Sequence, residues 1–220
     1  MNIIKFAFSE AQYLKQETKK VQIYLHHTAG NSSAIGVAKY WGTTKDRVAT
    51  SYIIAGKQKA SSTEKDGDVV ECFDSKYWAY HLGLKQQIFT EKGSTFQWLD
   101  KVSIGIEVCC WGQLTKQADG TFKNYVGGNV PKDEVVELEK PFRGFKFYHS
   151  YTDAQIKSLK ELLLSIKAKH NIDLTYHDDI WDICKRALDG KNGVFTHNSV
   201  RKDKVDMYPH PKVIEMLKTL

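Results

Sequence analysis

The chain has 220 residues, of which 41% are hydrophobic and 26% charged, so it can bury a core without disulfide bonds and is neither disordered nor fibrous. Its formal charge of +6 is spread along the sequence, which suits an anionic partner or solubility alone, and no nucleic-acid-binding motif accompanies it. No segment approaches the ~18 to 20 apolar residues of a membrane span, and polar residues interrupt the N-terminal apolar run. We therefore expect a protein made in the cytoplasm without a signal peptide and without membrane insertion.

Four segments in the first half have the composition of β-strands, because β-branched and aromatic residues cluster there and glycine or turn residues follow. They span residues 20–30, 47–58, 67–73 and 102–112, and the last is apolar enough to be central in a sheet. Residues 31–44 carry serine caps and apolar residues at helical spacing, which predicts a helix packed against the first strand.

Periodicity fades from about residue 114 to residue 150, a stretch of mixed glycine, proline and charged residues that we interpret as functional loops or an insertion. Thr152 and Gln155 then form a capping-box pair ahead of residues 154–170. The apolar side chains of that segment fall on one face, so a long amphipathic helix is predicted.

The remaining elements are short. A helix is expected over residues 178–190, a strand over 193–197 and a terminal helix over 209–220, begun near a proline. Strands that alternate with helices, without an internal repeat, indicate an α/β fold.

The first predicted strand ends in two adjacent histidines, His26 and His27. Imidazole nitrogens need partners, and a strand end opens towards a cleft, so either residue is a candidate ligand or catalyst; a hydrogen-bonded structural histidine is the alternative. Because side chains alternate across a strand, only one of the two can join a given site. Alternation alone does not choose between them.

A third histidine, His197, directly follows the short strand near the C-terminus, with Asp206 nine residues later and Lys204 two residues before that aspartate. A strand-end histidine and a carboxylate on the following loop can converge on one metal ion. One of the two adjacent histidines would complete a zinc site with three protein ligands and an open position.

Glu107 lies inside the apolar strand "SIGIEV". An unpaired buried charge is costly, so this carboxylate must face a polar cavity, pair with a cation or shift its pKa, unless the strand is an edge strand open to water. The functional interpretation is a general base close to a metal site.

The sequence gives weaker support to other kinds of metal site. The sequence has no His-Glu-x-x-His helix and no cysteine-rich knuckle. His177 and Asp178 could bind a metal, but they lie where a helix is expected to begin, and acidic residues are ordinary there.

Five motifs, in order "IYLHHTAG", "SYIIAG", "WAYHLG", "SIGIEV" and "THNSVRKDKVD", resemble those of the type 2 N-acetylmuramoyl-L-alanine amidases. This zinc family includes phage amidase-lysozymes, cytoplasmic anhydromuropeptide amidases and peptidoglycan recognition proteins. The resemblance covers most of residues 20–210, outside 114–150. It implies one catalytic domain over residues 1–220, interrupted by an insertion at about 114–150, with a central mixed β-sheet flanked by helices.

The resemblance also implies roles for individual residues. The family's first zinc ligand aligns with His26, and His27 falls in the following, more variable place. His197 matches the second zinc histidine, and Asp206 matches the third ligand. Zn²⁺ is therefore the implied cofactor.

Three further positions match the family's catalytic machinery. Glu107 resembles its catalytic acid/base, Lys204 the residue that stabilises the developing oxyanion, and His81 a histidine that lines the substrate groove. Two departures are Ser51, where many relatives have histidine, and the composition of the loop from His197 to Asp206.

The function implied by the resemblance is hydrolysis of the bond between muramic acid and the L-alanine of the peptidoglycan stem peptide. The insertion and the basic charge favour a phage or prophage endolysin that is released to the cell wall. We expect it to be a monomer. A cytoplasmic amidase that recycles soluble muropeptides is the first alternative. The second is a module that only binds peptidoglycan, although non-catalytic relatives usually lack the complete ligand set.

Overall fold

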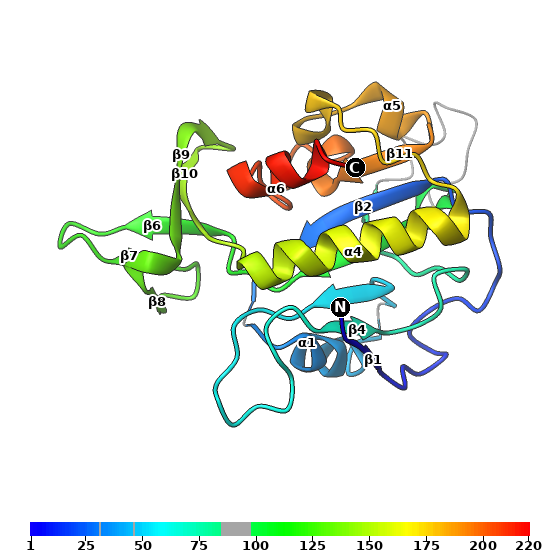
Figure 1. Cartoon of the computed structure of the whole chain (residues 1–220), viewed down its shortest axis with the longest axis horizontal. Helices are drawn as coiled ribbons and strands as arrows, with labels where there is room; N and C mark the ends of the chain where they lie inside the picture. The colour runs from blue at the N-terminus through cyan, green and yellow to red at the C-terminus, as the bar shows by residue number, and fades with distance from the viewer. Residues whose placement is uncertain (31, 46, 85–97) are drawn as a thin grey trace.

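The computed structural model describes residues 1–30, 32–45, 47–84 and 98–220. A six-stranded sheet crosses the body of the molecule (Figure 1). Its strands, in spatial order, are β1 (Ile3–Lys5), β4 (Val69–Glu71), β3 (Tyr52–Ile54), β5 (Ser103–Val108), β2 (Gln22–His27) and β11 (Gly193–Thr196). The strands from β3 to β11 run parallel, whereas β3 and β4 are antiparallel. The predicted mixed sheet is thus confirmed.

Two helices cover opposite faces of this sheet. Successive strand residues point to opposite faces, so Ile53 of β3 packs in a cluster with α1 (Ala34–Trp41), and Ile54 packs in a cluster with α4 (Asp153–His170). Figure 1 shows α4 lying along the sheet beside β2. Helices on both faces explain why the central strands β2 and β5 are buried almost throughout.

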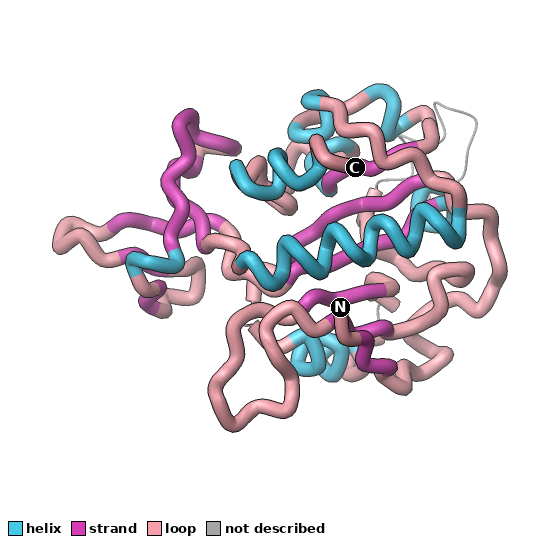
Figure 2. The backbone as a smooth tube through the Cα atoms, in the orientation of Figure 1, coloured by secondary structure: helices cyan, strands magenta, loops and turns pink. Residues whose placement is uncertain are grey.

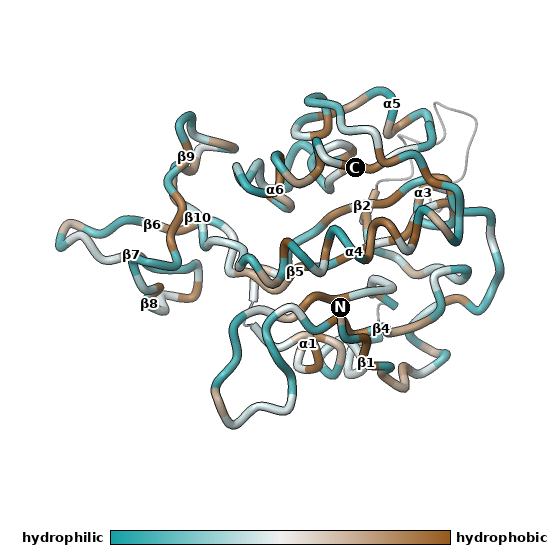
Figure 3. Tube along the Cα trace, in the orientation of Figure 1, coloured by the Kyte–Doolittle hydropathy of each residue, from teal (hydrophilic) through white to brown (hydrophobic). Residues whose placement is uncertain are grey.

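The long helix α4 begins at the predicted capping box. The Thr152 hydroxyl accepts a hydrogen bond from the Gln155 amide at 3.0 Å, and the Thr152 amide donates to Gln155 Oε1, also at 3.0 Å. Figure 3 shows hydrophobic and hydrophilic positions alternating along its turns. The apolar side chains that it buries against the sheet are Leu159, Leu162, Leu163 and Ile166.

The other helical segments are short. They are α3 (Trp98–Val102), α5 (Lys185–Leu188), α6 (Pro211–Leu217) and the 3-10 turns η1 (Lys132–Glu134), η2 (Asp178–Trp181) and η3 (His197–Ser199). The single helix predicted over residues 178–190 is wrong, because Asp182 is extended and its carboxylate accepts from the next backbone amide at 2.7 Å. Within the described ranges, no helix combines the length and the apolar composition that crossing a bilayer requires.

A second sheet, here called the inserted sheet, occupies residues 113–149 and projects from one end of the molecule (Figure 2). Its antiparallel strands, in spatial order, are β8 (Asn129–Val130), β7 (Phe122–Lys123), β6 (Gln113–Lys116), β10 (Phe145–His149) and β9 (Val135–Phe142). The region without periodicity is therefore β-structure. Strands β7 and β8 have two residues each, and in the longer strand β9 only Leu138 is buried, so little apolar alternation is left to detect.

Candidate metal centre and active site

The register between β2 and β5 sets His26 beside Glu107. These two residues are paired in neighbouring parallel strands, so their side chains point to the same face of the sheet. The next pair, His27 and Val108, points to the opposite face, where His27 Nδ1 lies 3.0 Å from the Tyr151 hydroxyl. Of the two adjacent histidines, His26 is the one that shares a face with Glu107.

His197 and Asp206 reach His26 from the segment after β11. Because β11 pairs with β2 and Thr196 lies opposite Leu25, the chain delivers His197 to the level of His26. His26 Nδ1 lies 3.1 Å from His197 Nδ1 and 3.1 Å from Asp206 Oδ2, and His197 Nδ1 lies 2.9 Å from the same carboxylate oxygen. Three potential ligand atoms thus converge on one point.

This cluster fits a zinc ion by its chemistry and its spacing. Nitrogen and oxygen ligands at about 2.0 to 2.2 Å from a tetrahedral zinc are separated from each other by about 3.3 Å, which is close to the separations here. Among the described residues, His26, His197 and Asp206 are the group of three whose ligand atoms could hold a metal. His177 and Asp178 are exposed at the start of η2 and do not join it.

Hydrogen bonds on the far side of each imidazole leave Nδ1 free to act as a ligand. His197 Nε2 donates to the Leu82 carbonyl at 2.9 Å. The Ser103 hydroxyl donates to the Leu99 carbonyl at 2.6 Å, so its oxygen accepts from His81 Nε2 at 2.9 Å. His81 Nδ1 then accepts from His26 Nε2 at 3.1 Å, and the lone pair of His26 Nδ1 faces the cluster.

The His81 ring therefore lies behind His26 rather than on an open groove. Its side chain is only 4% exposed, and both of its ring nitrogens are engaged. Asp100 fixes the same turn, since one of its carboxylate oxygens accepts from the backbone amides of His81 and Leu82 at 3.0 and 3.1 Å. This environment suits a residue that orients a ligand, as metal-bound histidines commonly require.

The electrostatics of the cluster favour a neutral histidine beside an ionised carboxylate. Burial, reinforced by the positive charge that His197 can carry, lowers the pKa of His26 to about 4 despite the neighbouring Asp206. Burial opposes ionisation of Asp206, but the two histidines outweigh it and hold the pKa of that carboxyl well below its usual range. A neutral imidazole and a carboxylate are the forms that bind metal ions.

Glu107 lies next to this cluster at the edge of a cavity of about 420 Å³. Its Oε2 atom is buried and has no hydrogen-bond partner. Burial raises the pKa of Glu107 well above its ordinary value, and the negative charge of Asp206 raises it further, whereas Lys204 acts in the opposite direction. A carboxylate with a raised pKa and an unpaired oxygen is suited to accept a proton and release it.

Two of the positions around the site escaped the sequence analysis. Ser103 lies two residues before Gly105 and four before Glu107, so all three share one face of an otherwise apolar strand. That alternation was a readable signal. The Leu82 carbonyl offered none, because a backbone acceptor carries no side-chain signature.

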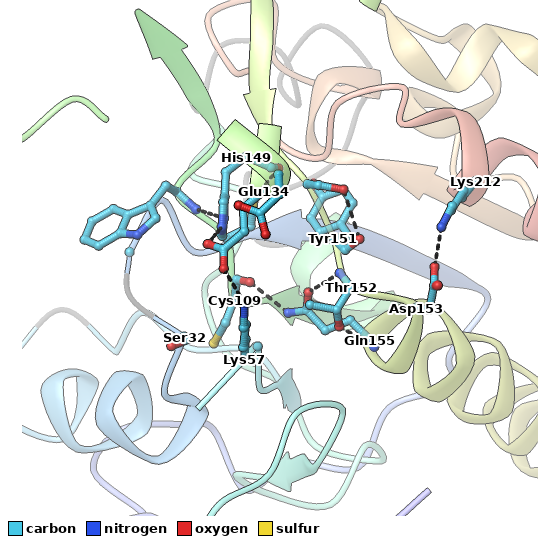
Figure 4. Close-up of a pocket in the computed structure, with 16 residues that line it drawn as sticks. Ser32, Lys57, Cys109, Glu134, His149, Tyr151, Thr152, Asp153, Gln155 and Lys212 are labelled. Atoms are coloured by element: carbon cyan, nitrogen blue, oxygen red, sulfur yellow. Dashed lines mark hydrogen bonds and ion pairs between the residues drawn. The ribbon is translucent and has the colours of Figure 1, made fainter. Parts of the chain in front are cut away.

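A second cavity, of about 340 Å³, lies where the inserted sheet meets the start of α4 (Figure 4). Four of its charged side chains are paired: Lys57 contacts Glu134 at 2.8 Å, and Lys212 contacts Asp153 at 2.6 Å. Glu134 also lies 3.5 Å from His149 Nε2. The contact between Lys57 and Glu134 ties the inserted sheet to the main body, whereas that between Lys212 and Asp153 joins α6 to α4. The metal-type cluster lies elsewhere.

Fold and site together define an α/β protein with a His-His-Asp cluster beside a buried acid. The sequence pattern of the N-acetylmuramoyl-L-alanine amidase family matches residues 17–210, and the chain belongs to that family. No curated protein sequence gives a significant match.

Solved structures share the fold at low sequence identity. PlyL has a TM-score of 0.54 and 14% identity, with 99% of this chain and 98% of that chain covered. The catalytic domain of XlyA has a TM-score of 0.53 and 15% identity, with 100% and 98% covered. The amidase AmiD from E. coli, solved with anhydro-N-acetylmuramic acid-L-Ala-D-gamma-Glu-L-Lys, has a TM-score of 0.51 and 17% identity, with 92% and 59% covered.

Proposed function

We propose that the chain is a zinc-dependent amidase that hydrolyses the bond between the lactyl group of N-acetylmuramic acid and the L-alanine of the stem peptide in bacterial peptidoglycan. The observation that carries this proposal is the convergence of His26 Nδ1, His197 Nδ1 and Asp206 Oδ2 beside Glu107, in a member of the amidase family. These three atoms would hold the zinc ion. When bound, zinc supplies a Lewis acid that polarises a carbonyl and makes water a nucleophile at neutral pH.

Glu107 is proposed to move the proton. As water attacks the amide carbon, the carboxylate accepts a proton from it and passes that proton to the alanine nitrogen when the carbon–nitrogen bond breaks. A carboxylate remains on the lactyl group and an amine is freed on L-alanine. Support comes from the unpartnered Oε2 atom and the raised pKa, which favours return of the proton to the leaving nitrogen.

Lys204 is proposed to stabilise the negative charge that develops on the amide oxygen. Its charge lowers the pKa values of both Glu107 and His26, so it acts on the same small region as the proton carrier. A fixed cation beside a developing oxyanion is among the strongest catalytic devices in a site shielded from water.

We infer that the physiological substrate is the wall polymer, and that the chain is a phage or prophage endolysin that reaches the wall after release. The net charge of +6 supports association with an anionic wall. A muropeptide-recycling amidase is the competing candidate, favoured by the fold shared with AmiD, which was solved with a soluble muropeptide.

The direct test is mass spectrometry of purified peptidoglycan digested with the protein, with and without a zinc chelator. Free stem peptides that begin with L-alanine are expected only when zinc is present. Cosedimentation with the wall without any release would instead identify a binding module. Release from soluble muropeptides but not from intact sacculi would favour the recycling enzyme.

A further inference from the structure

The cavity beside Glu107 extends between α1 and the inserted sheet. Glu107 lines it, together with Tyr40 and Trp41 from α1 and Tyr125 from the loop between β7 and β8. The remaining lining residues are small or apolar, and no lysine, arginine or histidine is among the described residues that line it. An aromatic cavity without a cation thus continues directly from the candidate acid/base.

Its tyrosines are unusually exposed. Tyr40 is 68% exposed and Tyr125 is 63% exposed, and in the described part of the chain no other tyrosine is classed as exposed. Both line the same cavity, although Tyr40 lies on helix α1 and Tyr125 on a loop of the inserted sheet. Large apolar side chains left in water and gathered around one cavity are typical of a binding surface.

The loop that carries Tyr125 is held in shape before any ligand arrives. Asn124 is buried, its side chain accepts from the Gly128 amide at 2.8 Å, and its backbone amide donates to the Gly128 carbonyl at 2.9 Å. The Trp111 ring packs near Tyr125, with ring centroids 6.4 Å apart. A preorganised loop loses little conformational entropy on binding.

We propose that this cavity is a saccharide subsite, in which Tyr125 and Tyr40 pack against a sugar of the glycan strand next to the N-acetylmuramic acid whose amide is cleaved. The inference rests on the proposed amidase function. The carbon–hydrogen faces of a pyranose ring pack on aromatic faces, and its hydroxyl and acetamido groups can bond tyrosine hydroxyls. A stem peptide carries carboxylates and would meet no cation here, so a neutral sugar fits the lining better.

The test compares Tyr125→Ala with Val126→Ala. Val126 is 62% exposed on the same loop and does not line the cavity, so it is a matched control. Binding of a peptide-free tetrasaccharide of alternating N-acetylhexosamines to the zinc-loaded full chain is measured by titration calorimetry. Tyr125→Ala should weaken binding about tenfold, while Tyr125→Phe and Val126→Ala should stay within about twofold of the wild type. Absence of binding to the wild type, or equal binding to Tyr125→Ala, overturns the proposal.

Kinetics give the second readout. Tyr125→Ala should lower kcat/KM about tenfold on a tetrasaccharide–peptide and leave the value for an N-acetylmuramoyl-peptide without further sugars unchanged. If the decrease in kcat/KM depends on the length of the peptide rather than on that of the glycan, the cavity binds the stem peptide and the inference is overturned. Because the binding assay needs no hydrolysis, glycan binding without L-alanine release would refute only the proposed amidase function.

Discussion

The main sheet and the inserted sheet differ in how deeply their strands are buried and in which candidate functional residues they carry. In the main sheet, helices on both faces bury the strands, and the register between β2, β5 and β11 fixes His26, Glu107 and His197 next to each other. The inserted sheet has its own cluster of only three buried apolar residues, Leu114, Phe122 and Val130, and exposed side chains in the loop between β7 and β8. The candidate site thus lies on the well-buried sheet, and the proposed sugar contact lies on the sheet with the smaller core.

The largest effect is expected from a metal ligand of the main sheet. His197→Ala removes one of three ligand atoms, so zinc binding should be lost and L-alanine release should fall to background on every substrate. Zinc content measured by mass spectrometry and release from sacculi are the readouts. Full activity with stoichiometric zinc would show that the ligands lie elsewhere.

The second largest effect is expected at Glu107, the acid beside the His-His-Asp cluster. Glu107→Gln keeps the shape of the side chain but cannot accept the proton, so kcat should fall about 100- to 1000-fold while zinc remains bound. Paired measurements of kcat and zinc content check this. Near-wild-type turnover would remove Glu107 from the proposed proton transfer.

A smaller effect is expected from His81, which is hydrogen-bonded to the candidate ligand His26. His81→Ala removes the acceptor for His26 Nε2, so the tautomer that presents Nδ1 is no longer fixed, and zinc affinity should fall about 10- to 100-fold. His81→Gln can still accept this bond through its amide oxygen and should recover part of the affinity. Competition with a chelator of known affinity measures both variants. An affinity equal to that of the wild type in His81→Ala would contradict a positioning role.

The smallest effect on chemistry is expected in the inserted sheet. Phe122→Ala empties much of its small cluster, which typically costs about 3 to 5 kcal/mol for a buried phenylalanine. Hydrogen exchange should accelerate in β6, β7 and β8 while β2 and β5 stay protected, and activity on a small muramoyl-peptide should persist. Loss of protection in both sheets would mean that the two do not unfold separately.

Sequence patterns predicted most strands of the main sheet but none of those in the inserted sheet, and the reason is physical. The strands around His26 and Glu107 are apolar and bounded by turns, so their composition was sufficient. Strands such as Phe122–Lys123 are too short to show a period, and their pairing is set by turns and by neighbours distant in sequence.

In the site, too, local sequence patterns predicted some residues, whereas the positions of others depend on contacts between distant parts of the chain. The types and spacing of His197 and Asp206 predicted a metal site, and family resemblance favoured His26 over His27. The place of His81 depends on a hydrogen bond that joins residues 55 positions apart, and no local pattern encodes it.

Strand register puts one of two adjacent histidines, His26, in the His-His-Asp cluster and the other, His27, on the opposite face of the sheet. The most direct measurement is the zinc bound per folded chain in His26→Ala and His27→Ala, prepared side by side. We expect that His27→Ala retains about one zinc per chain and that His26→Ala retains none. Retention of zinc by His26→Ala with its loss from His27→Ala would contradict the register on which the whole site is built.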